Sequence, residues 1–141
     1  MIKPKFSIVL IAKNEAKTLP KCIASLKNFQ DRGGEIVLCD TGSTDGTSEL
    51  ARSLGCKVEE VGEKFITVLD EEMADKLNKR FVVEGEEPIV KAGNRLFDFA
   101  SARNYVTSLA SNDFVFTMDA DEVYTNLNID KINHWIDEGY E

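Results

Sequence analysis

Two aspartates one residue apart, Asp119 and Asp121, are the clearest candidates for chemistry in this sequence. Side chains at positions i and i+2 of an extended segment project to the same side, so the two carboxylates can share one ligand. Carboxylate oxygens are hard donors that suit Mg²⁺ or Mn²⁺, particularly when a diphosphate supplies further oxygens. The triplet alone is weak evidence, because about one Asp-X-Asp is expected by chance in a chain of this composition. An acidic turn before the last helix is the alternative.

Asp40 is a second candidate, because residues 40–43 read Asp-Thr-Gly-Ser, as in the active site of aspartic proteases. That chemistry needs two aspartates that share a proton, and the sequence holds no second copy of the motif. At the end of a strand, the Asp40 carboxylate could instead accept a hydrogen bond from a nucleotide base or a ribose hydroxyl. It could equally bond its own turn. Thr44 or Asp45 is the expected N-cap of the helix that follows.

The remaining reactive side chains give weaker signals. Arg103 stands in a helical segment of small residues, where its guanidinium could bind a phosphate or simply face solvent. His134 lies in the last predicted helix, remote from the strand ends, and we expect no catalytic role for it. Cys22, Cys39 and Cys56 have apolar neighbours and no C-x-x-C spacing, which predicts free thiols in a core under reducing conditions.

A parallel sheet is the framework that the apolar pattern predicts for these residues. Continuous apolar runs are typical of strands covered on both faces, and the strands alternate with segments of helical periodicity. Because β-α-β crossovers are right-handed, this order predicts an α/β fold with a mostly parallel sheet flanked by helices. We expect strands at 6–11, 35–39, 56–61 and 113–118, and helices from about 18, at 49–54, at 101–111 and at 129–137.

Polar clusters follow three of the predicted strands, at 13–15, 40–45 and 119–122. Ligands of open parallel sheets bind in the crevice beyond the carboxyl ends of the strands. The three clusters therefore predict one binding site at that edge. The loop after the second strand matches neither G-x-G-x-x-G nor a Walker A sequence, which argues against a dinucleotide-binding Rossmann site and an NTPase.

The segment 59–87 differs from the rest, because it holds ten acidic and four basic side chains. Ile66, Leu69, Met73 and Leu77 would line one face of a helix from about 66 to 80. A charge run of this kind usually forms a solvated face. We expect one domain over 1–141, in which 62–95 form an acidic insertion or lid.

Composition excludes several classes of partner. The chain has 141 residues and a formal charge of −8, which argues against binding to nucleic acid or anionic lipid. No apolar run approaches the length of a membrane span. We expect a cytoplasmic protein, or one held at the cytosolic face of a membrane through segments outside this chain.

Three segments, in this order, resemble the family 2 glycosyltransferases, which use nucleotide sugars and have a GT-A fold. They are FSIVLIAKNEAKTLPKCIASL, EIVLCDTGSTDGTSELARSLGCKV and FDFASARNYVTSLASNDFVFTMDADE. The resemblance implies a nucleoside-diphosphate sugar, most simply a UDP-sugar, as donor. It also implies transfer with inversion to an acceptor, which could be a saccharide, a lipid or a protein.

The resemblance also implies roles for individual residues. The backbone at Ile11 and Ala12 would flank the nucleotide, with Glu15 nearby. Asp40 would accept a hydrogen bond from the base. Arg103 would reach the nucleotide or its phosphates.

The Asp-X-Asp motif of the family corresponds to Asp119 and Asp121. The resemblance places Asp119 toward the ribose and Asp121 on Mn²⁺ or Mg²⁺, so that Asp121 is the one catalytic residue expected here. The chain ends soon after this motif, and no residue matches the general base or the acceptor site of the family. We therefore expect a truncated, donor-binding part that transfers sugar poorly alone.

Two other functions remain open from the residues. A non-catalytic module that binds nucleotide sugars would need no general base. A sugar-1-phosphate nucleotidyltransferase would need a Gly-rich loop with Arg and Lys after the first strand, where this chain has KNEAKTLPK.

Overall fold

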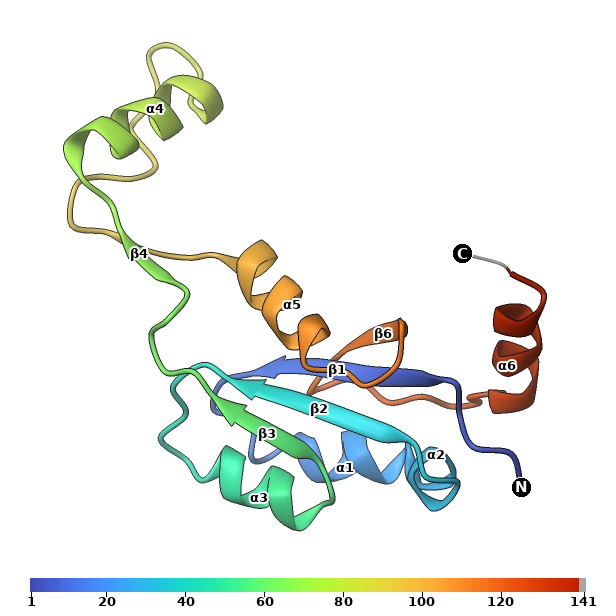
Figure 1. The fold of residues 1–141 in the computed structure, drawn as a ribbon. Coiled ribbons are helices and arrows are strands. Elements are labelled where there is room, and N and C mark those ends of the chain that lie inside the picture. Colours follow the sequence, from blue (N-terminus) through green and yellow to red (C-terminus); the bar gives the residue numbers. More distant parts are fainter. Residues whose placement is uncertain (140–141) are drawn as a thin grey trace. The chain divides into compact units, whose positions relative to one another are not determined.

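The computed structural model describes residues 1–139, and the chain divides into two compact units (Figure 1). One unit comprises Met1–Lys64 together with the residues from Ala100 on. The other comprises Phe65–Phe99. We describe each unit by itself.

The first unit is built on a parallel sheet of four strands in the order β3-β2-β1-β6. The strands are β1 (Phe6–Ala12), β2 (Glu35–Asp40), β3 (Lys57–Glu60) and β6 (Phe114–Asp119). All four lie where the apolar runs predict them, within one or two residues. The predicted α/β fold with a mostly parallel sheet is therefore confirmed.

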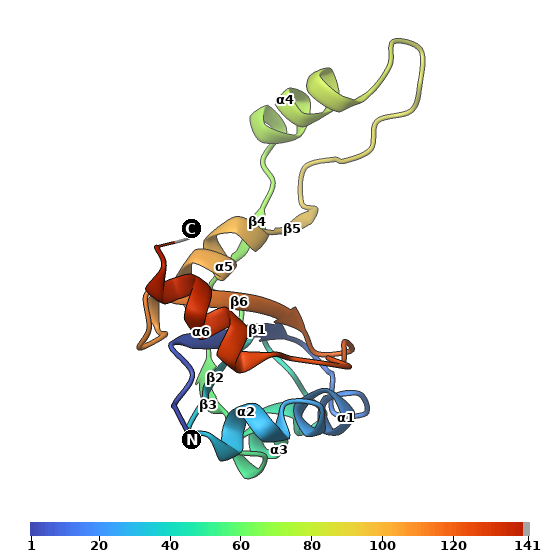
Figure 2. The ribbon, with the colours of Figure 1, turned by 90° about the vertical axis from the view of Figure 1, so that its right-hand side faces the viewer.

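Helices cover both faces of this sheet (Figures 1 and 2). The helix expected from about residue 18 is divided in two, because the chain turns at Ser25 and Leu26 before the helix resumes. The other expected helices are present, and none among the described residues is long and apolar enough to cross a membrane. The helices of this unit are α1 (Leu19–Ala24), α2 (Lys27–Asp31), α3 (Thr47–Ser53), α5 (Phe99–Ser108, of which Phe99 belongs to the second unit) and α6 (Ile129–Asp137).

The central strand β1 is buried on both faces, which explains its continuous apolar sequence. Phe6, Ile8 and Leu10 belong to the larger core, with α1, α2 and α6, whereas Val9 packs with Val106 of α5 in a smaller one. Successive strand residues therefore contribute to opposite cores, as the two-residue period of a strand requires. Burial on both sides therefore holds β1 and β2 in place, whereas β3 and β6 at the ends of the sheet are more exposed.

The three cysteines are free and buried, as the sequence predicts. Burial raises the pKa of the Cys22 and Cys39 thiols to about 11 and that of Cys56 to about 12. The reactive thiolate form is therefore scarce at neutral pH.

The second unit consists of the strands β4 (Ile66–Val68) and β5 (Arg95–Phe97), paired antiparallel, and the helix α4 (Glu71–Phe81). The prediction of a helix starting at residue 66 is wrong. Ile-Thr-Val is β-branched throughout and forms a strand. The helix starts after Asp70, whose carboxylate accepts a hydrogen bond from the backbone N–H of Met73 at 2.8 Å.

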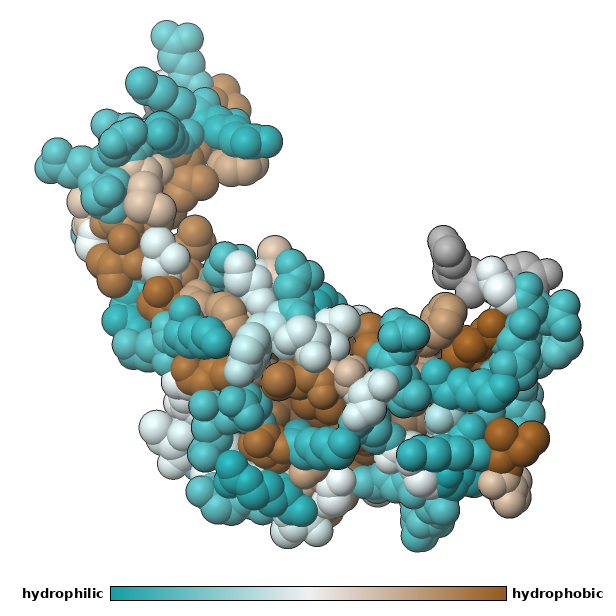
Figure 3. All heavy atoms as spheres, in the orientation of Figure 1, coloured by the Kyte–Doolittle hydropathy of each residue, from teal (hydrophilic) through white to brown (hydrophobic). Residues whose placement is uncertain are grey.

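This unit buries few of its large apolar side chains. Leu69 and Ala74 are buried, but Met73, expected on the buried face, is 38% exposed. Figure 3 shows apolar side chains at the surface of this unit. The exposed large ones are Val68, Met73, Phe81, Val83, Ile89, Leu96 and Phe99.

Candidate functional site

The strand register places the ends of β2, β1 and β6 side by side. Ala12 of β1 lies beside Asp40 of β2, and Ile11 lies beside Asp119 of β6. Because the strands are parallel, the loops that follow them leave the sheet at the same edge. The three polar clusters of the sequence therefore belong to one edge of one sheet, and we call it the carboxyl edge.

Asp40 organises the loop that follows it. Its side chain is buried, and Oδ1 accepts hydrogen bonds from the backbone N–H groups of Gly42 at 3.0 Å and Ser43 at 2.7 Å. Oδ2 accepts a hydrogen bond from the hydroxyl of Ser48 on α3. Both oxygens thus have partners within the chain, as in the turn interpretation. A hydrogen bond to a base would use a further lone pair and stays a prediction.

The expected N-cap of α3 is wrong. The N-cap is Gly46, which has a φ of 85°, a conformation that glycine adopts without strain. Asp45 lies one residue earlier, and its Oδ1 accepts a hydrogen bond from the backbone N–H of Thr47 at 3.1 Å. Thr44 instead donates its backbone N–H to Asn14.

Substitution of Asp40 tests how much this side chain stabilises its loop. We expect Asp40→Ala to lower the free energy of unfolding by about 2 kcal/mol, because three donors, among them the buried hydroxyl of Ser48, lose a charged acceptor. Urea unfolding of this variant measures the effect. Asp40→Asn keeps the shape and one acceptor and should lose about half as much. Wild-type stability in Asp40→Ala would contradict the organising role.

Hydrogen bonds join the loop after β1 to the loop after β2. The backbone N–H of Asn14 donates to Ser43 Oγ at 2.8 Å, and Asn14 Oδ1 accepts from the backbone N–H of Thr44 at 2.7 Å. Asn14 has a φ of 54°. No local sequence pattern marks Asn14 for this contact, although asparagine is enriched among residues that adopt this conformation.

Glu15 shapes the start of α1. Its Oε2 accepts a hydrogen bond from the Thr18 hydroxyl at 2.9 Å, and its backbone carbonyl accepts from the N–H groups of Thr18 and Leu19. Its own N–H donates to Thr47 Oγ1 at 3.0 Å. Glu15 therefore lies at the carboxyl edge, and contact with a nucleotide stays a prediction.

Asp119 is the last residue of β6 and Asp121 lies in the turn that follows, with both side chains exposed. The turn is closed by Glu122, whose Oε1 accepts from the N–H of Asp119 at 2.8 Å and whose own N–H donates to the Asp119 carbonyl at 3.0 Å. Within residues 1–139, neither aspartate carboxylate has an ion pair or a hydrogen bond. Two exposed carboxylates without partners fit a divalent cation whose other ligands come from a diphosphate.

The acidic side chains of this turn act on a buried thiol of the neighbouring core. The pKa of Cys22 is raised chiefly by burial and further by the charges of Glu122 and Asp121. In the described part of the chain, no group of three or more His, Cys, Asp or Glu side chains is arranged to hold a metal by itself. The pair of aspartates is therefore the metal-binding candidate that the carboxyl edge offers.

Arg103 lies on α5 beside the end of β1. Its side chain lines a small cavity of about 10 Å³ together with Ile11, Thr117 and Met118. In the described residues, no carboxylate pairs with its guanidinium, so the charge is available to an anionic ligand. The structure thus brings Arg103 and Ile11 together, as their expected roles require.

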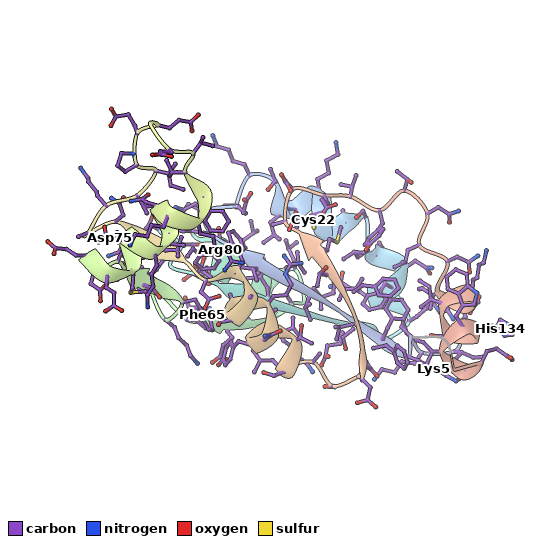
Figure 4. The ribbon with its side chains drawn as sticks, turned by 90° about the horizontal axis from the view of Figure 1, so that it is seen from above. Lys5, Cys22, Phe65, Asp75, Arg80 and His134 are labelled. Atoms are coloured by element: carbon purple, nitrogen blue, oxygen red, sulfur yellow. The ribbon has the colours of Figure 1, made fainter. Side chains whose placement is uncertain are left out.

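His134 is exposed on α6 and points away from the sheet, as Figure 4 shows. That it takes no part in catalysis stays a prediction.

Sequence comparisons give a family for the chain. Residues 7–65 match the model of glycosyl transferase family 2. An uncharacterized glycosyltransferase of Rickettsia felis is 28% identical over 130 residues, which cover 92% of this chain and 33% of the relative. The chain spans between one fifth and one third of the length of the first curated relatives that it matches.

Structure comparisons agree with the family. The crystal structure of S. aureus TarS 1–349 in complex with UDP aligns with a TM-score of 0.59 at 20% identity, over 94% of this chain and 32% of that chain. Glucosyl-3-phosphoglycerate synthase from Mycobacterium tuberculosis in complex with Mn²⁺, UDP and glucosyl-3-phosphoglycerate aligns with a TM-score of 0.50 at 25% identity, over 83% of this chain and 33% of that chain. Residues 7–65 therefore belong to a family 2 glycosyltransferase domain, and the chain has the GT-A fold of these neighbours, as the resembling segments predict.

Proposed function

We propose that the chain is the donor-binding part of a glycosyltransferase that binds a UDP-sugar and a divalent cation at the carboxyl edge of the sheet. The sugar would pass with inversion to an acceptor bound outside this chain. The observation that carries the proposal is the placement of Asp119 and Asp121, exposed and unpartnered within residues 1–139, at the edge that Arg103 also reaches.

Two similar proteins support the choice of ligands. S. aureus TarS has been crystallised with UDP, and the mycobacterial synthase with Mn²⁺ and UDP. A common fold places equivalent strand ends at equivalent positions, but function depends on the side chains at those ends. Here the side chains are carboxylates and one guanidinium, which suit a metal-bound diphosphate.

The charge of the carboxyl edge supports metal dependence. Its acidic side chains include Glu15, Asp40, Asp45, Asp119, Asp121 and Glu122. A nucleoside diphosphate is itself strongly negative, so its approach to these groups is repulsive unless a cation lies between them. Arg103 and Lys13 do not balance the charge of these six carboxylates, and a divalent cation on the aspartate pair would lower the repulsion at the diphosphate.

Each residue has a defined task in this proposal. Asp121 would hold Mg²⁺ or Mn²⁺, with Asp119 on the side of the ribose, and Arg103 would pair with a phosphate. The bound cation would offset the negative charge that develops on the leaving diphosphate. Asp40 and the backbone of Ile11 and Ala12 would form the walls of the nucleotide site.

Transfer also needs a base that takes a proton from the acceptor hydroxyl as it attacks. We assign no residue of this chain to that task. The chain alone is therefore expected to bind the donor much better than it transfers sugar.

Calorimetric titration tests the proposed function. We expect UDP to bind in the presence of Mn²⁺ and to bind at least tenfold more weakly after the metal is removed with EDTA. ADP and GDP serve as controls for the base. Equal binding with and without metal would contradict metal dependence, and no binding of any nucleoside diphosphate would contradict the proposed function.

A further inference from the structure

We propose that Asn14 is a positioning residue that locks the loop after β1 to the loop after β2 in the arrangement that receives the nucleotide. This inference rests on the proposed function. The two loops directly follow Ala12 and Asp40, the last residues of β1 and β2, which belong to the proposed nucleotide site. The strand register holds Ala12 beside Asp40, and beyond these two residues contacts between the loops fix their relative positions.

The backbone of Asn14 is held in an unfavourable conformation. With a φ of 54°, it is the one non-glycine residue with a positive φ in the described part of the chain. Left-handed backbone costs an L-residue on the order of 1 kcal/mol, although asparagine tolerates it better than most. Such a conformation persists only where surrounding contacts impose it, and these sites are often functional.

The contacts that impose it come from the loop after β2. Asn14 bonds Ser43 through its N–H and Thr44 through Oδ1, at 2.8 and 2.7 Å. The next two residues repeat the pattern, because the N–H of Glu15 donates to Thr47 Oγ1 and that of Ala16 donates to Asp45 Oδ2. Three consecutive N–H groups of one loop thus have acceptors from the other.

A second set of bonds closes the connection into a ring. Asp40 holds the N–H of Ser43, and Thr41 donates its N–H to the carbonyl of Ala12 at 3.0 Å. The path from Ala12 through Asn14 and Ser43 to Asp40 therefore returns to Ala12. In this ring, Asn14 contributes a side-chain acceptor from the loop after β1, and Ser43 contributes one from the loop after β2.

Asn14 is exposed, so its removal takes little from the core. Its loss instead leaves the two loops free to move against each other, and ligand binding must then supply the cost of ordering them. A structural role would lower the melting temperature and leave the affinity of the folded protein unchanged. A positioning role lowers the affinity with little change in melting temperature.

Asn14→Gly is the informative variant, because glycine adopts the same φ without strain and removes only the side-chain bond. We expect the Kd for UDP with Mn²⁺ to rise about tenfold, while the melting temperature falls by no more than a few degrees. Asn94→Gly is the matched control. Its Oδ1 accepts a backbone N–H from Lys91 at 2.9 Å in the second unit, and its loss should change the Kd less than twofold.

Ser43→Ala removes the hydroxyl oxygen that accepts the N–H of Asn14, and it should weaken UDP binding to a similar extent. Since both substitutions open the same connection, the double variant should bind little worse than either single one. Binding within twofold of wild type in both single variants would overturn the positioning role and leave the proposed function standing. No UDP binding by the wild-type chain would overturn both.

Discussion

Replacement of Asp121 by alanine is expected to weaken Mn²⁺-dependent UDP binding by at least about 30-fold. The substitution removes a charged ligand, and a charge-assisted contact contributes roughly 2–3 kcal/mol, where about 1.4 kcal/mol corresponds to a factor of ten. The carboxylate is exposed and has no hydrogen bond within residues 1–139, so its loss should leave the fold intact. Titration with UDP at a fixed Mn²⁺ concentration measures the effect.

Asp113→Ala is the control for this prediction. Asp113 is also an exposed aspartate, but it immediately precedes β6, whereas Asp121 follows the strand. The control changes the net charge equally and should alter the Kd less than twofold. The Kd of Asp119→Ala for UDP should lie between those of Asp113→Ala and Asp121→Ala, because Asp119 is proposed to lie on the side of the ribose. Equal UDP affinity in Asp121→Ala and the wild type would show that the turn is merely an acidic turn.

Replacement of Glu35 by alanine is expected to lower the free energy of unfolding by about 3 kcal/mol at pH 7. Glu35 lies at the start of β2, and its side chain is only 8% exposed. Its carboxylate accepts hydrogen bonds at 2.7 Å from the hydroxyl of Ser7 and from both the N–H and the hydroxyl of Ser111, and it forms an ion pair with Lys57. One carboxylate thus links β1, β2, β3 and the segment before β6.

The pKa of Glu35 makes this contribution depend on pH. Burial alone would raise the pKa, but the hydrogen bonds from Lys57, Ser111 and Ser7 outweigh burial and lower it from 4.5 to about 2. Because the folded pKa lies below the unfolded one, the stabilisation is fully present above about pH 5 and is lost as the pH falls toward 2.

Urea unfolding of Glu35→Gln against wild type tests this pH dependence. The difference in stability should be large at pH 7 and should shrink steadily between pH 4.5 and 2, where the wild-type carboxyl becomes neutral like the amide. Glu84→Gln, at an exposed position, should change stability by less than about 0.5 kcal/mol throughout. A Glu35→Gln difference that is the same at pH 7 and pH 2.5 would contradict the assignment.

The sheet could be predicted because its signal is local. Strands buried on both faces must be apolar at every position, and β1 and β2 show this directly. The helix expected over 66–80 is present from Glu71 on, but its first turn is wrong because Ile66 and Leu69 fit a helical period by chance. The spacing of apolar residues takes no account of the β-branched residues that favour a short strand, or of Asp70, which caps the helix.

The positions of the candidate residues in the fold could be predicted, whereas their roles in a site stay predictions. Asp119 ends β6, Asp121 follows it and Arg103 lies in α5, and the sequence marks all three elements. The protease-like letters from Asp40 lie in a βα turn of a parallel sheet, where Asp40 bonds its own loop. The position of these residues in the fold, and not the match of four residues, decides between the protease and the turn interpretations.

The connections that hold the site together could not be predicted. Asn14 bonds a loop 29 residues away, and Glu35 bonds Ser111 across 76 residues. Such pairs depend on which strands become neighbours, and no local pattern marks them. Both residues look like ordinary surface polar positions until the sheet is assembled.

Amide chemical shifts give the most direct test of the central claim that the carboxyl edge binds the nucleotide diphosphate. UDP is added with Mg²⁺, which avoids the paramagnetism of Mn²⁺. The account predicts shifts of the backbone amides of Ala12–Glu15, Thr41–Ser43 and Ala120–Glu122, and no shifts at Gly33, Gly34 or Ser111 at the opposite edge. Shifts confined to that opposite edge, or none at saturating UDP and Mg²⁺, would contradict it.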